Sequence, residues 1–444
     1  MLSQQEVKNI IDQVVGYSKL PGCEVNVQWT EDDFIRFANN GITTSGYRVT
    51  QQISITSTTA DKRSGNAAVG ELTPEALKNG VKQAEDLAVI SRPNPEDMPA
   101  LPAQQYPRLS NFDAYTASAR GDLMVPQVKA VLASAVKNKL VAAGYIQRSA
   151  NAVGVGNKAG LFGYHTYTDS SLTHTMRNRE GTSSGWATQS SISVKDLNGE
   201  EQAKVSIGKC LNGANRKKID PGKYTVVLEP AAVADLIGWL GFGMDARDAE
   251  QGQSFLSKPG APGGTLLGEK LYPEIITLRS DPFHPTLAST PWGPSLLPNE
   301  KIAWIDKGVV SNLYYDRFWA EKAGKKPTPY PTNLLLDGQQ NSLADLISSV
   351  ERGLLVTRLW YIRVVQPKTW QLTGLTRDGV FLIEKGKVTD PVANFRWNES
   401  PAEVLQRTTK LTEPVRVTNT ETGSNIVPAL ITQDFNFTSV SDAV

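Results

Sequence analysis

The chain has 444 residues, which is enough for two or three domains that each bury a core of their own. Its 46 lysines and arginines nearly balance 45 aspartates and glutamates, so the net charge of +1 excludes a protein that holds nucleic acid or an anionic membrane through bulk charge. Two cysteines, Cys23 and Cys210, form neither a disulfide framework nor a cysteine-based zinc cluster, and this favours a reducing compartment.

The N-terminal residues predict an amphipathic helix rather than a targeting segment. Ser3 and Glu6 have the spacing of a capping box, and apolar residues follow at helical spacing up to Val14. The basic and then apolar build of a signal peptide is missing, and no apolar run approaches the roughly 18 residues that a membrane span needs. We therefore expect a soluble, cytoplasmic protein without membrane contact.

Strand and helix patterns then alternate. Residues 23–29 alternate apolar and polar side chains as a half-buried strand does, and residues 35–38 and 47–56 continue in that style. Thr73, followed by Pro74, predicts the start of a second helix. The pattern up to this point is helix, strands, helix.

A connector separates this part from the next helix. Residues 91–110 contain several prolines and cannot hold a regular element. A helix is predicted over residues 126–142, with Pro126 in its first turn. Residues 144–195 are rich in Ser, Thr, Tyr and Gly and predict strands, and the glycines of residues 154–160 indicate a turn because they lack the spacing of a nucleotide-binding loop.

Two histidines in this strand-rich part are candidate metal ligands. A tight hairpin centred on Asp169 and Ser170 would place His165 and His174 opposite each other on neighbouring strands. A stable zinc site needs three or four ligands, however, and the only other histidine is His284. The two histidines alone are therefore too few to form a stable zinc site.

The most informative stretch is a strand that runs into a helix after a turn at residues 216–221. Residues 226–228 are apolar and Pro230 suits a first helical turn; the helix then repeats apolar residues at helical spacing, at Val233, Leu236, Ile237, Leu240 and Met244. The helix offers glycines where a catalytic helix would offer His or Glu. Each glycine costs about 0.8–1 kcal/mol relative to Ala, so we expect another segment to pack closely against this helix.

This strand and helix resemble the signature region of the TldD/PmbA (TldE) family. The resemblance implies that the TldD branch carries a His-Glu-x-x-x-His zinc motif on the helix. Aligned on residues 226–228, the motif's three functional positions fall on Gly238, Trp239 and Gly243. None of them retains the motif residue, which is the pattern of the TldE/PmbA branch.

Three later segments are similar to family segments, namely residues 308–320, 343–356 and 372–388. The last of them predicts two strands joined by a turn at Lys385-Gly386. The resemblance also implies a cysteine that completes the zinc site in TldD-type members, and its position here is Arg377. A guanidinium group cannot coordinate a cation, so we expect no metal in this chain.

We expect an α+β protein with two domains. Residues 1–215 would form an N-terminal α/β domain with helices on a mostly antiparallel sheet and a connector near 91–110. Residues 221–444 would form a strand-rich, barrel-like C-terminal domain that carries the vestigial metal-motif helix. The Gly- and Pro-rich tract between Met244 and Pro298 is expected to form an interface or a substrate channel.

The resemblance implies a non-catalytic subunit, without catalytic residues of its own, in a zinc metallopeptidase complex that cleaves short or unfolded peptides. Its partner would be a TldD-like catalytic subunit that holds the zinc, or a second copy in a homodimer. Arg317 and Arg377 are candidate binders of peptide carboxylates, because the planar guanidinium suits a carboxylate. Either arginine would serve equally well in an ion pair.

Two alternatives stay open, so the sequence leaves the enzyme question undecided. The first is an autonomous metal-dependent hydrolase with relocated ligands drawn from His165, His174, Asp245 and Asp248. The second is a non-enzymatic binding or modulator protein, which reflects the family's association with DNA gyrase. The near-zero net charge argues against direct contact with nucleic acid.

Overall fold

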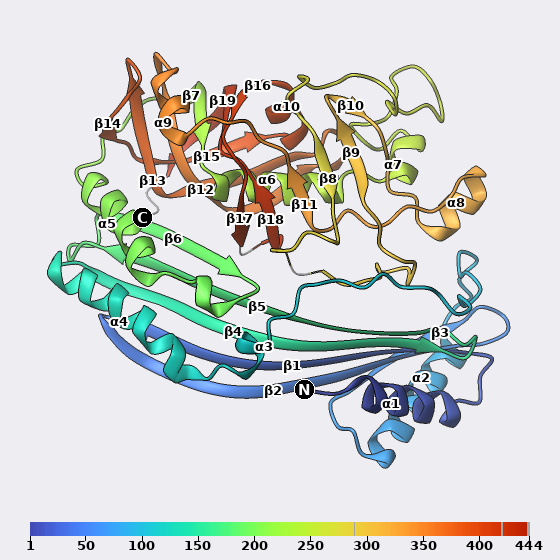
Figure 1. Cartoon of the computed structure of the whole chain (residues 1–444). Helices are drawn as coiled ribbons and strands as arrows, with labels where there is room; N and C mark the ends of the chain where they lie inside the picture. Colours follow the sequence, from blue (N-terminus) through green and yellow to red (C-terminus); the bar gives the residue numbers. More distant parts are fainter. Residues whose placement is uncertain (288, 419–420, 442–444) are drawn as a thin grey trace.

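A computed structural model describes residues 1–287, 289–418 and 421–441 (Figure 1). Its first half is one antiparallel sheet in the order β3-β2-β1-β4-β5-β6. These strands are β1 (Gly22–Ala38), β2 (Gly41–Thr58), β3 (Ser64–Val69), β4 (Val141–Asn157), β5 (Phe162–Arg177) and β6 (Ser184–Ser191). The helices of this half are α1 (Gln4–Tyr17), α2 (Pro74–Ile90), α3 (Ala114–Ser118), α4 (Gly121–Lys137) and α5 (Gly199–Asn212), with a 3-10 turn η1 (Val194–Asp196).

One face of this sheet carries helices, and the other turns toward the second half of the chain (Figure 1). The apolar side chains of α1 and α2 form one core with β1 and β2, and those of α4 and α5 form another with β1, β4 and β5. Gly154 and Gly156 lie in β4, where an added Cβ would sit 2.2 Å from Val7 and 2.5 Å from Ile11. The predicted glycine turn is thus wrong for these two residues, because they let α1 approach the sheet; the turn comes after them, at Asn157–Gly160.

Two further sequence predictions in this half need correction. The predicted helix over residues 126–142 is α4, which starts at Gly121 and ends at Lys137. It ends early because Lys139 adopts a left-handed conformation (φ 57°) that turns the chain into β4. The predicted hairpin at Asp169 and Ser170 is also wrong, since both residues lie inside the continuous strand β5, which pairs along its length with the similarly long β4.

The second half contains a closed five-stranded barrel, which confirms the barrel-like α+β prediction. The barrel follows the order β12-β7-β19-β15-β13, and β13 pairs back with β12. Its strands are β7 (Gly222–Leu228), β12 (Arg352–Gln366), β13 (Gln371–Glu384), β15 (Asn394–Glu399) and β19 (Leu430–Ser441), with β14 (Lys387–Pro391) and β16 (Thr408–Leu411) at its margins. The predicted Lys385-Gly386 turn joins β13 and β14, both residues having positive φ.

A smaller sheet lies beside the barrel, in the order β10-β9-β8-β11-β18-β17. It is built from β8 (Leu278–Ser280), β9 (Ile302–Asp306), β10 (Val309–Val310), β11 (Leu334–Leu336), β17 (Val415–Thr418) and β18 (Ser424–Val427). The helices of this half are α6 (Pro230–Phe242), α7 (Ala246–Glu250), α8 (Arg317–Ala323), α9 (Leu343–Ser348) and α10 (Pro401–Gln406), with a 3-10 turn η2 (Pro367–Thr369).

The predicted central helix is α6, which contacts both the barrel strand β12 and the smaller-sheet strands β11, β17 and β18 (Figure 1). It is buried nearly all round, as expected for a helix in which every residue except Asp235 is apolar. Its residues belong to the largest core of the molecule, together with barrel and small-sheet side chains. The helix α6 is therefore the element that the barrel and the smaller sheet share.

The predicted connector runs between the two halves without regular structure (Figure 1). Glu96 accepts two hydrogen bonds of 2.9 Å from Arg247 of α7, and the hydroxyl of Tyr106 donates to the carbonyl of Leu296 at 2.7 Å. The predicted domain boundaries themselves stay a prediction. No helix in the described part of the chain is long and apolar enough to span a lipid bilayer.

Candidate functional site

Neighbouring side chains occupy the space beside the helix positions that the family resemblance aligns with the metal motif. An added Cβ on Gly238 would lie 1.9 Å from Oγ1 of Thr422, and one on Gly243 would lie 2.8 Å from the indole of Trp370. The same indole donates a hydrogen bond of 2.8 Å from Nε1 to the carbonyl of Trp239. The expectation that another segment packs closely on this helix is confirmed, and these segments are the β12–β13 connection and the β17–β18 connection.

A bulge in β13 turns a carboxylate into the interior between the two halves of the chain. The register between β12 and β13 shifts at Asp378, whose φ is 57°, and such a bulge re-aims the side chain of the extra residue. Asp378 accepts hydrogen bonds of 2.8 Å from Oγ of Ser184 and from Nε of Arg358, and Nη2 of Arg358 is 2.7 Å away. Since Ser184 belongs to β6, this buried ion pair joins the two halves of the chain.

Aromatic rings surround the two arginines of this cluster. The guanidinium of Arg358 lies 4.6 Å from the ring centroid of Trp186 and 5.2 Å from that of Trp360, and Arg377 is also 5.2 Å from Trp360. Nε of Arg377 is 3.9 Å from Asp378. Arg377, at the position of the expected cysteine, is therefore held by an aromatic face and a shared carboxylate.

Asp235 is the charged residue of α6, and it points into the core. It is 5% exposed, and within the described residues its Oδ1 has no hydrogen-bond partner. Burial, with a smaller contribution from the like charge of Glu421, raises the pKa of Asp235 well above its ordinary value, and Arg358 opposes that shift. Burial of an unpaired carboxylate disfavours the ionised form, so the proton stays on Asp235 over a wide pH range.

Replacing Asp235 with Asn is expected to remove a pH-dependent loss of stability. The unfolded chain releases this proton near pH 3.9, whereas the folded chain holds it to higher pH. The contribution of Asp235 to wild-type stability is therefore fully present below about pH 4, and above that pH it falls by up to about 1.4 kcal/mol per pH unit. Urea denaturation of both proteins between pH 4 and pH 8 measures the difference. An advantage of the variant that does not grow with pH would contradict this assignment.

The four residues of the relocated metal site do not come together. His165 and His174 lie nine residues apart on β5 and so face opposite sides of the sheet, about 30 Å apart at 3.3 Å per residue. Nε2 of His165 is 2.9 Å from Oδ1 of Asn111, and Nε2 of His174 is 2.9 Å from Oγ of Ser206. Burial lowers the pKa of each histidine to about 4.

Asp245 and Asp248 form a helix cap instead of a metal site. The side chain of Asp245 caps α7 by accepting the backbone N–H of Asp248 at 2.9 Å. Across the described residues, no three His, Cys, Asp or Glu side chains are grouped so that they could hold a metal ion. The prediction that His165, His174, Asp245 and Asp248 form a relocated metal site is therefore wrong.

Arg317 lies at the start of α8, next to the connector. Its Nη2 donates a hydrogen bond of 2.6 Å to the carbonyl of Pro99. Burial lowers the pKa of its guanidinium, and Glu24 and Asp97 oppose that change. The structure thus gives Arg317 a contact between the halves; its proposed role toward a peptide stays a prediction.

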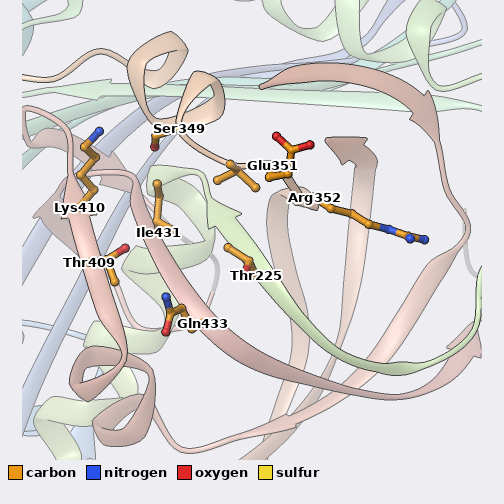
Figure 2. Close-up of a pocket in the computed structure, with 9 residues that line it drawn as sticks. Thr225, Ser349, Glu351, Arg352, Thr409, Lys410, Ile431 and Gln433 are labelled. Carbon is orange, nitrogen blue, oxygen red and sulfur yellow. The ribbon is translucent and has the colours of Figure 1, made fainter. Parts of the chain in front are cut away.

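Several hollows open on the surface of the second half. One of about 360 Å³ lies between the start of β12 and the strands β16 and β19, where Arg352 points away from Ile431 and Gln433 (Figure 2). Another, of about 640 Å³, is formed by residues 250–264 and the η2 residues Lys368 and Thr369. Part of the Gly- and Pro-rich tract thus lines a hollow, and its role as an interface or substrate channel stays a prediction.

A third hollow, of about 280 Å³, touches α6 itself. Gly238 and Phe242 line it from the helix, Asp169 lines it from β5, and Arg416 lines it from β17. Gly238 is one of the predicted site residues. Asp169 and Arg416 had no signal in the sequence, because they meet only through the contact between the two halves.

Comparisons with known proteins agree with this architecture. Residues 221–439 match the family model described as PmbA/TldA metallopeptidase C-terminal domain. Metalloprotease PmbA of Escherichia coli O157:H7 is 22% identical over 401 residues, covering 86% of this chain and 83% of that protein. The structure of TldE from Thermococcus kodakarensis has a TM-score of 0.85 and 20% identity, covering 97% of this chain and 99% of that one. At this identity, the solved structure supports a shared fold.

Proposed function

Because the chain belongs to the PmbA/TldD family, we propose that it is a TldE/PmbA-like subunit without a metal centre of its own, which pairs with a TldD-like zinc metallopeptidase that cleaves short or unfolded peptides. The pair would work in the cytoplasm, and we expect no contact with nucleic acid or membrane. A homodimer of this chain is the alternative assembly.

The packing of α6 carries this proposal. Zinc is held in proteins by Cys, His, Asp or Glu side chains, and the family positions hold Gly238, Trp239, Gly243 and Arg377. Thr422 and the Trp370 indole occupy the space that a side chain at Gly238 or Gly243 would need. The residues present therefore do not fit a zinc ion at this place, and this chain would contribute shape and binding surface to the complex.

We expect peptide cleavage only when this chain is mixed with a TldD-type partner. Zinc hydrolysis needs a metal that polarises the carbonyl and lowers the pKa of its bound water, with a general base beside it, and the partner would supply both. The assay compares cleavage of an unstructured peptide by this chain, by the partner and by the mixture. Native mass measured in parallel separates the heterodimer from a homodimer.

Two controls keep this assay decisive. Substituting the partner's metal ligands should abolish cleavage, whereas Trp239→Phe in this chain should leave it unchanged, because Phe retains the packing and the Trp239 carbonyl belongs to the backbone. Elemental analysis of this chain after exhaustive dialysis should find far less than one zinc per chain. Metal-dependent cleavage by this chain alone, at the rate of the mixture, would overturn the proposal.

A further inference from the structure

The hollow beside α6 is built by both halves of the chain. It measures about 280 Å³, just below the usual range of small-molecule pockets, and so has room for roughly one amino-acid residue. One wall is apolar and the other carries a charge. Its lining comes from β5, α6, the loop before β11 and the β17–β18 hairpin, and includes Asp169, Gly238, Phe242, Tyr330, Thr332 and Arg416.

The charged wall presents a carboxylate rather than a guanidinium. The side chain of Arg416 is only 7% exposed, whereas that of Asp169 is 28% exposed. Arg416 donates from Nη2 to Oδ1 of Asp169 and from Nη1 to the carbonyl of Thr286. The arginine thus lies behind the carboxylate and orients it, and the exposed part of the carboxylate is what a ligand would meet.

Two opposing effects act on the Asp169 carboxyl group. Burial raises its pKa above the ordinary value, and the charge and hydrogen bond of Arg416 oppose part of that rise and so favour the ionised form. A carboxylate bound by arginine through one oxygen retains lone pairs for a second donor. A donor that is itself positively charged makes the strongest hydrogen bond of this kind.

The apolar wall suits the carbon skeleton next to such a donor. Phe242 is 45% exposed at the end of α6, and Tyr330 is held edge-on by Tyr314 with ring centroids 5.0 Å apart. Aromatic faces attract cations and also bury apolar side chains. Gly238 contributes only helix backbone to the lining, and Thr422, which also lines the hollow, packs directly against it.

We propose that this hollow binds the amino-terminal residue of a peptide, with the α-ammonium group on Asp169 and the side chain against Phe242 and Tyr330. This inference rests on the proposed function insofar as the ligand is a peptide. It goes further, since it gives the metal-free chain a peptide site of its own and says which end of the peptide enters it. Arg317 and Arg377 do not line this hollow.

Calorimetric titration of the full-length chain, without any partner, tests the site. The probes are Leu-Gly-Gly, its N-acetylated form and its C-terminal amide. We expect the free peptide and the amide to bind alike, and acetylation to weaken binding at least about tenfold, which is the effect of losing about 1.4 kcal/mol of binding free energy. Equal binding of the acetylated peptide, loss of binding on amidation, or no binding of any probe would overturn the proposal.

Single substitutions test whether the peptide binds in this hollow. Asp169→Asn should weaken Leu-Gly-Gly binding about tenfold and leave the acetylated peptide unaffected, and Thr332→Trp should block both by filling the mouth of the hollow from an exposed position. Asp12→Asn, on the exposed surface of α1, is the matched control and should change nothing. Unchanged binding in Thr332→Trp would also overturn the site. Because no partner is present, this result stands apart from the cleavage assay of the proposed function.

Discussion

Asp378→Asn is expected to lower the free energy of unfolding by about 3–5 kcal/mol, which is the usual cost of removing one partner of a buried ion pair. Asp378 is 2% exposed and Arg358 is 9% exposed, so neither group can recover its interactions in water. The variant would leave the Arg358 charge between two indole rings without a carboxylate. Denaturation followed by tryptophan fluorescence measures the loss, because Trp186 and Trp360 flank the pair.

The matched control is an exposed ion pair in the same half. Lys217 and Asp390 are 2.8 Å apart, and their side chains are 59% and 34% exposed. Asp390→Asn should change stability by less than about 1 kcal/mol, as is usual for exposed pairs. A loss in Asp378→Asn no larger than that of the control would show that the buried pair does not tie the halves together.

Gly243→Leu is expected to destabilise the fold by about 2–4 kcal/mol. The new side chain would have to displace the Trp370 indole, and forcing extra methylenes into a packed interior costs about 1–3 kcal/mol. The hydrogen bond from Trp370 to the Trp239 carbonyl would be lost with it, at about 1 kcal/mol. Gly243 has φ −87°, so backbone strain adds nothing to the effect.

Gly16→Leu is the control for this substitution. Gly16 is an exposed helical residue of α1, and an added Cβ there meets nothing within 4 Å. Leucine has the higher helix propensity, so this variant should be as stable as wild type or slightly more stable. Equal thermal midpoints for the two leucine variants would mean that Trp370 does not need the space above Gly243.

The elements of the fold could be predicted from the sequence where the pattern is local. The capping box of Ser3 and Glu6 marks α1, and the apolar strand followed by Pro230 marks β7 and α6. The family resemblance added the barrel. Patterns of this kind depend on residues a few positions apart, which is the range over which caps, turns and periodicity act.

The contacts of the candidate site join residues that are far apart in the sequence. Asp378 meets Ser184, 194 positions away, and Arg416 meets Asp169, 247 positions away. No periodicity connects such pairs. The histidine hairpin failed for a related reason, since whether β5 turns or continues is decided by the length of its partner β4. Asp235 did leave a signal, as the charged residue in an otherwise apolar helix.

The pairing of β7 sets the order in which the molecule can form during synthesis. Val226 pairs with Leu354 on one side and with Thr432 on the other, so its second neighbour is made 206 residues later. At ribosomal rates of about 5–20 residues per second, that delay is roughly 10–40 seconds. During that delay α6, which is apolar except for Asp235, has no completed barrel to cover it. In a nascent chain the barrel therefore leaves this apolar helix uncovered until nearly the last strand has been translated, a condition that favours aggregation.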